Sequence, residues 1–208
     1  MRDIEWHNES VFTVEEFLTK EECEKFIAIS EDVGFDQATV RSPQGELVYK
    51  KLRNNQRVMF DNEEIADSLW EKAIDVVPME FDGHVAVGMN ERLRFYRYDS
   101  GQQFNWHQDS TVERDNGELS YFTVLIYLSD EFEGGETSFE DSYSDESFDE
   151  FQIIPKIGMA LFFEHPIHHK GEPVTAGRKY VLRSDVMYAT TETEDDFDDY
   201  DSEPDDDW

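Results

Sequence analysis

The stretch "RLRFYRYDSGQQFNWHQDS", residues 92–110, contains two short runs rich in aromatic residues, separated by Asp, Ser and Gly. This pattern predicts two strands joined by a turn. In a strand, residues i and i+2 point to the same side, so the side chains of His107 and Asp109 can reach one point. Both residue types are metal ligands. An H-x-D pair alone is a weak signal, because polar residues alternate in this way in many exposed strands.

The rest of the C-terminal half shows the same sequence pattern. "YFTVLIYL", "MALFF" and "KYVLRSDVMY" are further short runs of β-branched and aromatic residues, divided by Gly, Asp and Ser clusters. Helical patterns come first along the chain and strands follow. This order predicts an α+β, mainly β fold, with a double-stranded β-helix (jelly roll) core and N-terminal helices packed on one sheet.

Two helices are predicted before the strands. The first opens with Thr19 and Glu22 in capping-box spacing, and apolar residues then recur on one helical face. The second repeats the capping pattern at Asp61 and Glu64, and Pro78 lies beyond its end. Both helices are interpreted as packing elements.

These patterns predict a single domain over residues 1–188, with a helical part at 1–80 and a jelly-roll core at about 84–188. Residues 189–208 have the low-complexity acidic composition of a disordered tail. Residues 140–150 form a second acidic segment, which we expect to be a loop between strands that covers a site.

The charge of the chain is extreme. Its 208 residues include 50 acids and 18 bases, for a formal net charge of -32. Such a field repels nucleic acid and favours cationic partners or substrates, although it is equally compatible with a solubility or high-salt adaptation. The single cysteine cannot form an internal disulfide, which indicates a reducing compartment. No signal peptide or membrane span is evident, so a soluble, cytoplasmic protein is expected.

A third metal ligand is available in "EHPIHHKGEPV", which contains His165, His168 and His169. Two imidazoles and one carboxylate leave open positions on an octahedral ion, the arrangement associated with non-haem Fe(II) oxygenases.

Three motifs in order then narrow the interpretation: "RFYRYDSGQQFNWHQDS", "VLIYLSDEFEGGETSF" and "HKGEPVTAGRKYVLRSDVMY". They resemble the strand with H-x-D, the Y-L-x5-G-G-E/A-T segment and the H-x-G-x-P-V-x-x-G-x-K run of the 2-oxoglutarate- and Fe(II)-dependent oxygenases, in their prolyl 4-hydroxylase-like branch. Together they span most of residues 91–188.

The resemblance implies metal ligands at His107, Asp109 and His169. His168 is then interpreted as a neighbour that points to the opposite face of its strand. His165 is interpreted as a loop or surface histidine.

The resemblance also implies a site for the co-substrate. Lys179, ten residues after the last ligand, matches the family's anchor for the distal carboxylate, and Arg183 on the same face is the substitute candidate. Tyr98 and Tyr127 match tyrosines that help to hold the co-substrate, although both suit the core equally well. Thr137 is a further pocket candidate. The implied cofactors are Fe(II), 2-oxoglutarate and O2, with ascorbate as an additional candidate.

The implied reaction is hydroxylation of an unactivated C–H bond with release of succinate and CO2. A prolyl residue of a peptide or protein is the leading substrate, and a free amino acid or another side chain is the alternative. A cupin-like metal isomerase or hydrolase and a non-catalytic acidic binding module also stay open. If the acidic segment 140–150 borders the site, it favours a basic peptide.

Overall fold

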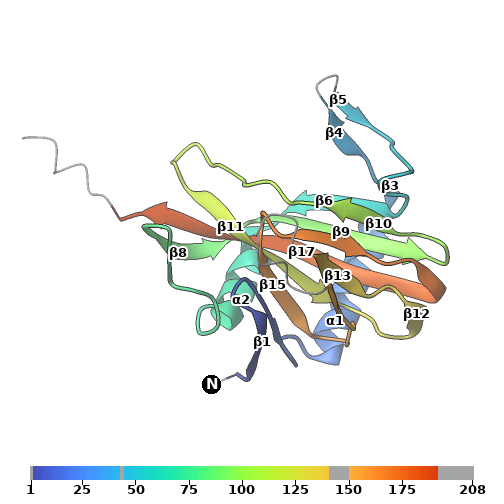
Figure 1. Cartoon of the computed structure of the whole chain (residues 1–208), viewed down its shortest axis with the longest axis horizontal. Helices are drawn as coiled ribbons and strands as arrows, with labels where there is room; N and C mark the ends of the chain where they lie inside the picture. The colour runs from blue at the N-terminus through green and yellow to red at the C-terminus, as the bar shows by residue number, and fades with distance from the viewer. Residues whose placement is uncertain (1, 43–44, 141–149, 192–208) are drawn as a thin grey trace, which may run out of the picture.

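The computed structural model describes residues 2–42, 45–140 and 150–191 (Figure 1). The helices of this part of the chain are α1 (Lys20–Val33) and α2 (Glu63–Ala73). The remaining regular structure is β, as the runs of aromatic and β-branched residues predict.

Most strands form one large antiparallel sheet. Its path runs β1, β2, β15, β11, β17, β9, β6, β3, with β7, β8 and β12 joined at the side. The strands are β1 (Ile4–Asn8), β2 (Val11–Val14), β3 (Asp36–Gln37), β6 (Gln56–Asp61), β7 (Glu80–Phe81), β8 (His84–Met89), β9 (Arg92–Asp99), β11 (Leu119–Tyr127), β12 (Phe132–Gly134), β15 (Ala160–Glu164) and β17 (Val174–Thr190).

A smaller antiparallel sheet runs in the order β10 (Phe104–His107), β16 (His168–Gly171), β13 (Thr137–Glu140), β14 (Phe151–Ile153). Apolar side chains from both sheets form one buried cluster between them. This arrangement is the predicted jelly roll. The short strands β4 (Val40–Ser42) and β5 (Gly45–Leu47) form a separate hairpin that projects from the body (Figure 1).

Alternation along the strands separates two cores. On β15, Phe162 belongs to the cluster under the helices, whereas Leu161 and Phe163 belong to the cluster between the sheets. Successive side chains of a strand point to opposite faces, so the strands β2, β9, β11, β15 and β17 contribute to both clusters. Burial of one such side chain contributes roughly 1.5–3 kcal/mol. The same alternation makes Lys179 and Arg183 of β17 line the pocket between the sheets.

The helix starts agree with the sequence in one case and differ in the other. The capping box of Thr19 and Glu22 is present at α1, with both reciprocal hydrogen bonds. At α2 the expected cap Asp61 is the last residue of β6, and Asn62 accepts the hydrogen bond from the backbone N–H of Ile65 instead. The predicted cap was therefore wrong by one residue, because Asp61 is already committed to the β6 ladder with β9.

The N-terminal part is less helical than expected. Besides its two helices, the segment 1–80 contains β1 to β6, and β1 and β2 extend the large sheet. At the other end, β17 continues to Thr190, two residues past the predicted boundary. The expected tail from residue 192 and the acidic loop at 141–149 lie outside the described residues. No helix in the described part is long and apolar enough to span a bilayer.

Candidate metal and co-substrate site

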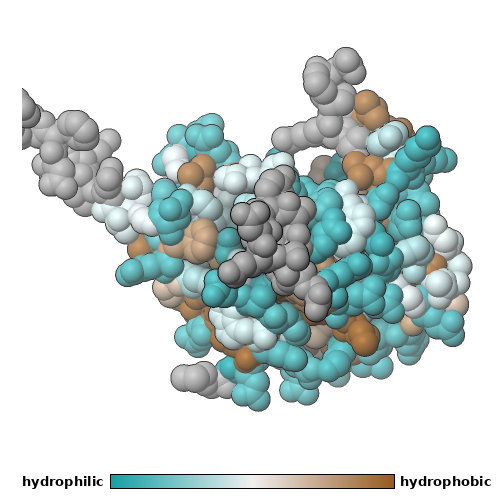
Figure 2. Space-filling view, viewed as in Figure 1, coloured by the Kyte–Doolittle hydropathy of each residue, from teal (hydrophilic) through white to brown (hydrophobic). Residues whose placement is uncertain are grey.

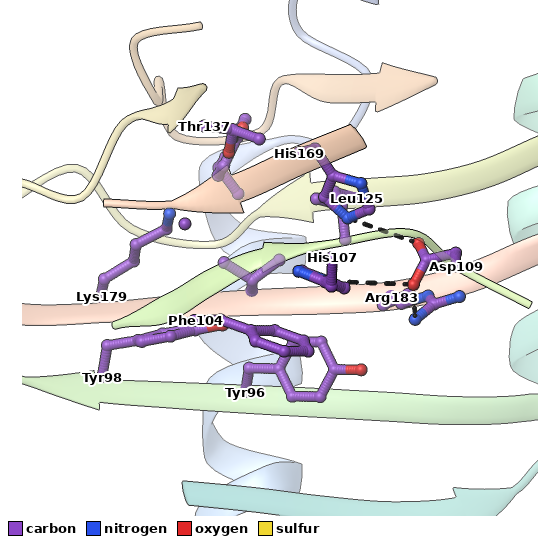
Figure 3. Close-up of a pocket in the computed structure, with 13 residues that line it drawn as sticks. Tyr96, Tyr98, Phe104, His107, Asp109, Leu125, Thr137, His169, Lys179 and Arg183 are labelled. Carbon is purple, nitrogen blue, oxygen red and sulfur yellow. Dashed lines mark hydrogen bonds and ion pairs between the residues drawn. The ribbon is translucent and has the colours of Figure 1, made fainter. Parts of the chain in front are cut away.

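Two neighbouring strands of the small sheet bring the predicted ligands together. His107 on β10 lies directly opposite His169 on β16, and their ring centroids are 4.1 Å apart. Asp109 follows the end of β10, where its backbone N–H donates to the carbonyl of His165. One ligand atom from each of His107, Asp109 and His169 lies within 4.8 Å of the others (Figure 3). Cross-strand pairing thus supplies the third ligand of the H-x-D pair.

Backbone carbonyls fix the orientation of both imidazoles. Nδ1 of His107 lies 2.7 Å from the carbonyl of Asn105, and Nδ1 of His169 lies 2.9 Å from that of Ile167. A carbonyl oxygen only accepts, so each Nδ1 carries the proton. The lone pair of each Nε2 therefore points toward Asp109, as metal-ligating histidines require.

The protonation states also suit a metal. Burial lowers the pKa of both His107 and His169, so both imidazoles are neutral at pH 7. Burial alone would raise the pKa of Asp109, but Arg183 and His169 lower it overall, and the carboxylate is ionised. Two neutral imidazoles and one carboxylate on one side of an ion leave positions for exogenous ligands, so this donor set fits Fe(II).

An arginine holds the carboxylate. Nη1 of Arg183 lies 2.7 Å from Oδ1 of Asp109, and the hydroxyl of Thr123 donates to Oδ2 at 2.7 Å. Arg183 also pairs with Asp185, which in turn pairs with Arg94. This series of alternating negative and positive side chains therefore fixes the position of the Asp109 carboxylate. In this position Arg183 touches the ligand cluster, at some distance from the pocket end where Lys179 lies.

A buried lysine marks the opposite end of the pocket (Figure 3). Lys179 is 4% exposed, donates to the carbonyl of Gly135, and lies over the rings of Tyr98 and Tyr127 at 5.5 and 5.2 Å. No carboxylate among the described residues is within ion-pair distance of its ammonium group. Burial lowers the pKa of Lys179 to about 7. An anion in this pocket would pair with a cation that the described residues leave without an ion-pair partner.

Both predicted tyrosines line the pocket. Tyr98 pairs with Lys179 across β9 and β17, and the hydroxyl of Tyr127 is 2.7 Å from that of Thr137. Burial raises the pKa of both phenols, which are therefore neutral hydrogen-bonding groups. Thr137, which the sequence left without a firm assignment, also lines the pocket.

Phe104 is a pocket residue that sequence reasoning missed. Its ring stacks on that of His107, with centroids 3.5 Å apart, although the two residues are three positions apart in one strand. Regular alternation would place them on opposite faces, but the β10–β16 register shifts between them. The resulting bulge turns both rings inward. Tyr96 was also missed, although its two-residue spacing from Tyr98 is a signal that would have identified it.

Of the two other histidines in this segment, His168 lies outside the ligand cluster, as expected, whereas His165 is not where it was expected. His168 lies outside the ligand cluster, with Nδ1 2.5 Å from a carboxylate oxygen of Glu140. His165 was expected on the surface and is only 2% exposed, so that expectation was wrong. Its ring nitrogens are hydrogen-bonded to the hydroxyls of Ser120 and Thr123. Because Thr123 donates to Asp109, His165 holds the hydroxyl group that fixes this ligand.

Known proteins are similar to this chain in sequence. Residues 93–184 match the family model described as the 2OG-Fe(II) oxygenase superfamily. The sequence is 26% identical to a probable prolyl 4-hydroxylase of Arabidopsis thaliana, over 85% of this chain and 68% of the relative. It is also 26% identical to a putative prolyl 4-hydroxylase of Acanthamoeba polyphaga mimivirus, over 82% of this chain and 71% of the relative.

Solved structures share the fold. A viral collagen prolyl hydroxylase from Paramecium Bursaria Chlorella virus-1, solved as a 2OG complex, matches with a TM-score of 0.61 and 21% identity, over 86% of this chain and 97% of that one. A prolyl hydroxylase from Trichoplax adhaerens, in complex with a hypoxia inducible factor peptide fragment, matches with a TM-score of 0.63 and 16% identity, over 85% and 83%. These structural similarities support a double-stranded β-helix fold for this chain.

Proposed function

Because this chain is a 2-oxoglutarate- and Fe(II)-dependent oxygenase of the prolyl-hydroxylase-like kind, we propose that it hydroxylates a prolyl residue of a peptide or protein. The observation that carries the proposal is one pocket with a two-histidine, one-aspartate cluster at one end and, at the other, a buried lysine that forms no ion pair within the described part of the chain. This combination fits a metal and an organic dianion together.

The protein's own groups have distinct roles in this proposal. His107, Asp109 and His169 would hold Fe(II), and Lys179 would pair with the distal carboxylate of 2-oxoglutarate. When bound, iron and 2-oxoglutarate would supply the oxidising chemistry together with O2, one atom of which enters succinate as the co-substrate loses CO2, while the other hydroxylates a C–H bond. The apolar wall between the two ends, which includes Phe104, excludes water.

The chain orients the co-substrate with few polar groups. The phenols of Tyr98 and Tyr127 border the lysine, and Thr137 fixes the hydroxyl of Tyr127. Such sparse polar groups in an apolar pocket set the orientation of a small ligand. A metal isomerase or hydrolase has no evident use for this cation, which disfavours the cupin-like alternative.

The substrate class is supported by the relatives. The curated relatives carry the name prolyl 4-hydroxylase, and one structural neighbour is complexed with a peptide. A peptidyl prolyl residue is therefore favoured over a free amino acid or another side chain. We further propose ascorbate as a supporting reductant, on the sequence resemblance alone, and a reducing, cytoplasmic location, supported by the buried free thiol of Cys23.

The proposal is tested in two stages. Fe(II) and 2-oxoglutarate are first added together without oxygen, and the expected result is a visible absorption band that Asp109→Ala abolishes. Oxygen is then admitted with proline-containing peptides, and succinate and a gain of one oxygen atom on the peptide are measured. An unchanged band in Asp109→Ala would refute the ligand assignment. Succinate formation together with hydroxylation of a free amino acid, and of no peptide, would replace the prolyl assignment with the alternative.

A further inference from the structure

The segment 41–57 carries a net positive charge in a very acidic chain. Residues 41–57 contain five bases and one acid, whereas the rest of the chain contains 13 bases and 49 acids. The bases are Arg41, Lys50, Lys51, Arg53 and Arg57, and the acid is Glu46. More than a quarter of all bases therefore lie in one short segment of a very acidic protein. We call residues 45–53 of this segment the basic arm.

The base of the arm is attached to the strand that carries His107. The carbonyl of Leu52 accepts from the N–H of Asn105 at 2.7 Å, and Arg53 forms an isolated β-bridge with Phe104. The guanidinium of Arg53 lies 4.1 Å from the centre of the Phe104 ring, which itself stacks on His107. The arm therefore begins beside the pocket wall.

The outer part of the arm is apolar and cationic. Leu47, Val48 and Tyr49 are 39%, 48% and 49% exposed, and Figure 2 shows hydrophobic surface on this projecting segment. Lys50 and Lys51 are exposed, and neither has an ion-pair partner among the described residues. Lys50 and Lys51 precede Arg53 by three and two residues, and consecutive Cα atoms are about 3.8 Å apart, so their backbone lies next to the base of the arm.

One guanidinium nitrogen of Arg53 lacks a hydrogen-bond acceptor among the described residues. Arg53 is 4% exposed, and its Nε donates to Oδ1 of Asn55, but its Nη2 has no hydrogen-bond partner in the part of the chain that the structure describes. A buried guanidinium nitrogen without an acceptor is unfavourable. This unpartnered nitrogen is an independent sign that the region receives an anionic group from outside.

We propose that the basic arm binds an acidic segment of the peptide substrate, next to the residue that enters the pocket. Lys50 and Lys51 pair with its carboxylates, and Leu47 to Tyr49 cover its apolar side chains. The inference rests on the proposed function, because it concerns the substrate of the same site. At physiological ionic strength charges are screened over about 8 Å, so these local cations outweigh the distant acidic surface.

This inference opposes the basic peptide that the acidic segment 140–150 predicts. Most of that segment, residues 141–149, lies outside the described residues, whereas the arm is joined to the pocket wall by hydrogen bonds and ring contacts. The charge preference of the substrate therefore discriminates between the two predictions.

The test compares three labelled peptides with the same central proline, flanked by Asp and Glu, by their amides Asn and Gln, or by Lys. Binding to the anaerobic enzyme with Fe(II) and 2-oxoglutarate is measured by fluorescence anisotropy. The expected result is roughly tenfold tighter binding of the acidic peptide than of the amide peptide. The double variant Lys50→Glu/Lys51→Glu should remove this preference.

A matched control is the double variant Lys20→Glu/Lys25→Glu on α1, which changes the net charge equally at exposed positions far along the chain. It should keep the preference. An equal loss in both double variants would overturn the proposal in favour of a general field effect. Tighter binding of the Lys-flanked peptide would overturn it in favour of a basic substrate.

Light scattering and mass spectrometry distinguish the remaining outcomes. If the arm variant changes the molar mass measured by light scattering and not peptide binding, the arm is a contact between copies and the proposal is wrong. Hydroxylation of the peptides is followed in parallel by mass spectrometry. Hydroxylation without any acidic preference refutes only the arm, whereas an acidic preference without hydroxylation of any peptide refutes the prolyl assignment and supports the arm.

Discussion

Arg183 holds Asp109 by an ion pair of 2.7 Å in the interior of the protein. Lys179, four residues earlier on the same face of β17, lies at the other end of the pocket. The two cations therefore serve different groups: Arg183 fixes a carboxylate of the protein, and Lys179 is available for a carboxylate of a ligand. We accordingly retain Lys179 as the proposed 2-oxoglutarate anchor and treat Arg183 as a positioning residue.

Arg183→Met should destabilise the fold by about 3–5 kcal/mol, because it leaves Asp109 and Asp185 buried without their shared cation. The measurement is the free energy of unfolding in urea. Arg178→Met is the control on the same strand. Its exposed pair with Asp99 is expected to contribute at most about 1 kcal/mol. Equal losses in both variants would contradict a special role for Arg183.

Lys179→Met should increase the stability of the fold and weaken the binding of 2-oxoglutarate. Burial lowers the pKa of this lysine to about 7, so the folded state at pH 7 carries a cost on the order of 1 kcal/mol or more that methionine removes. The variant should unfold at higher urea concentration and need a much higher concentration of 2-oxoglutarate. Reduced stability with an unchanged 2-oxoglutarate requirement would show that the lysine is structural.

The affinity for 2-oxoglutarate should fall as the pH rises. A free-enzyme pKa of about 7 means that Lys179 loses its charge above neutrality, and a bound dianion must restore that proton. The dissociation constant should therefore increase up to tenfold per pH unit above about pH 7, with proton uptake on binding. Calorimetry in buffers of different ionisation enthalpy measures both quantities. A pH-independent affinity between pH 7 and 9 would exclude this lysine as the anchor.

The lowered pKa of Lys179 also predicts how the free energy of unfolding depends on pH. The folded-state pKa of Lys179 lies below the unfolded value of about 10.4, so protonation favours the unfolded chain. The contribution of this group to stability is lowest below about pH 7 and increases as the pH rises toward 10. Lys179→Met should lack this increase.

Phe104→Leu should weaken metal binding by about tenfold, because the stacked ring fixes the orientation of His107. Titration with Mn(II), followed by calorimetry, measures the affinity without turnover. Phe60→Leu is the control, since Phe60 stacks on Phe95 in the core under the helices. Similar losses of stability with a lower metal affinity only in Phe104→Leu are expected. A lower affinity in both variants would indicate a general loosening of the fold.

Asn62→Ala should cost about 1 kcal/mol of stability, because Asn62 caps α2, and Asn62→Asp should restore most of it. Asp61→Ala removes only an exposed pair with Arg92 and should cost less. Urea unfolding distinguishes the variants. A larger loss in Asp61→Ala than in Asn62→Ala would favour the cap that the sequence predicts.

The sequence identified the pocket residues whose patterns are local. The H-x-D pair and the motif around Lys179 are short runs, and two-residue alternation places Lys179 and Arg183 on one face of a strand. The capping box of α1 is equally local, since its hydrogen bonds join Thr19 and Glu22. Such features depend on backbone geometry within a few residues, so the amino-acid order is sufficient to predict them.

The sequence by itself thus determined the jelly-roll class, the candidate ligands and the lysine. Only the tertiary structure decided the contacts between distant segments. Alternation gives the face of a strand but not its partner, so the pairing of His107 with His169 and of Asp109 with Arg183 was not predictable in detail. The bulge that turns Phe104 inward breaks the alternation itself. The burial of His165 and the position of the basic arm beside the pocket likewise follow from long-range packing, which local patterns do not encode.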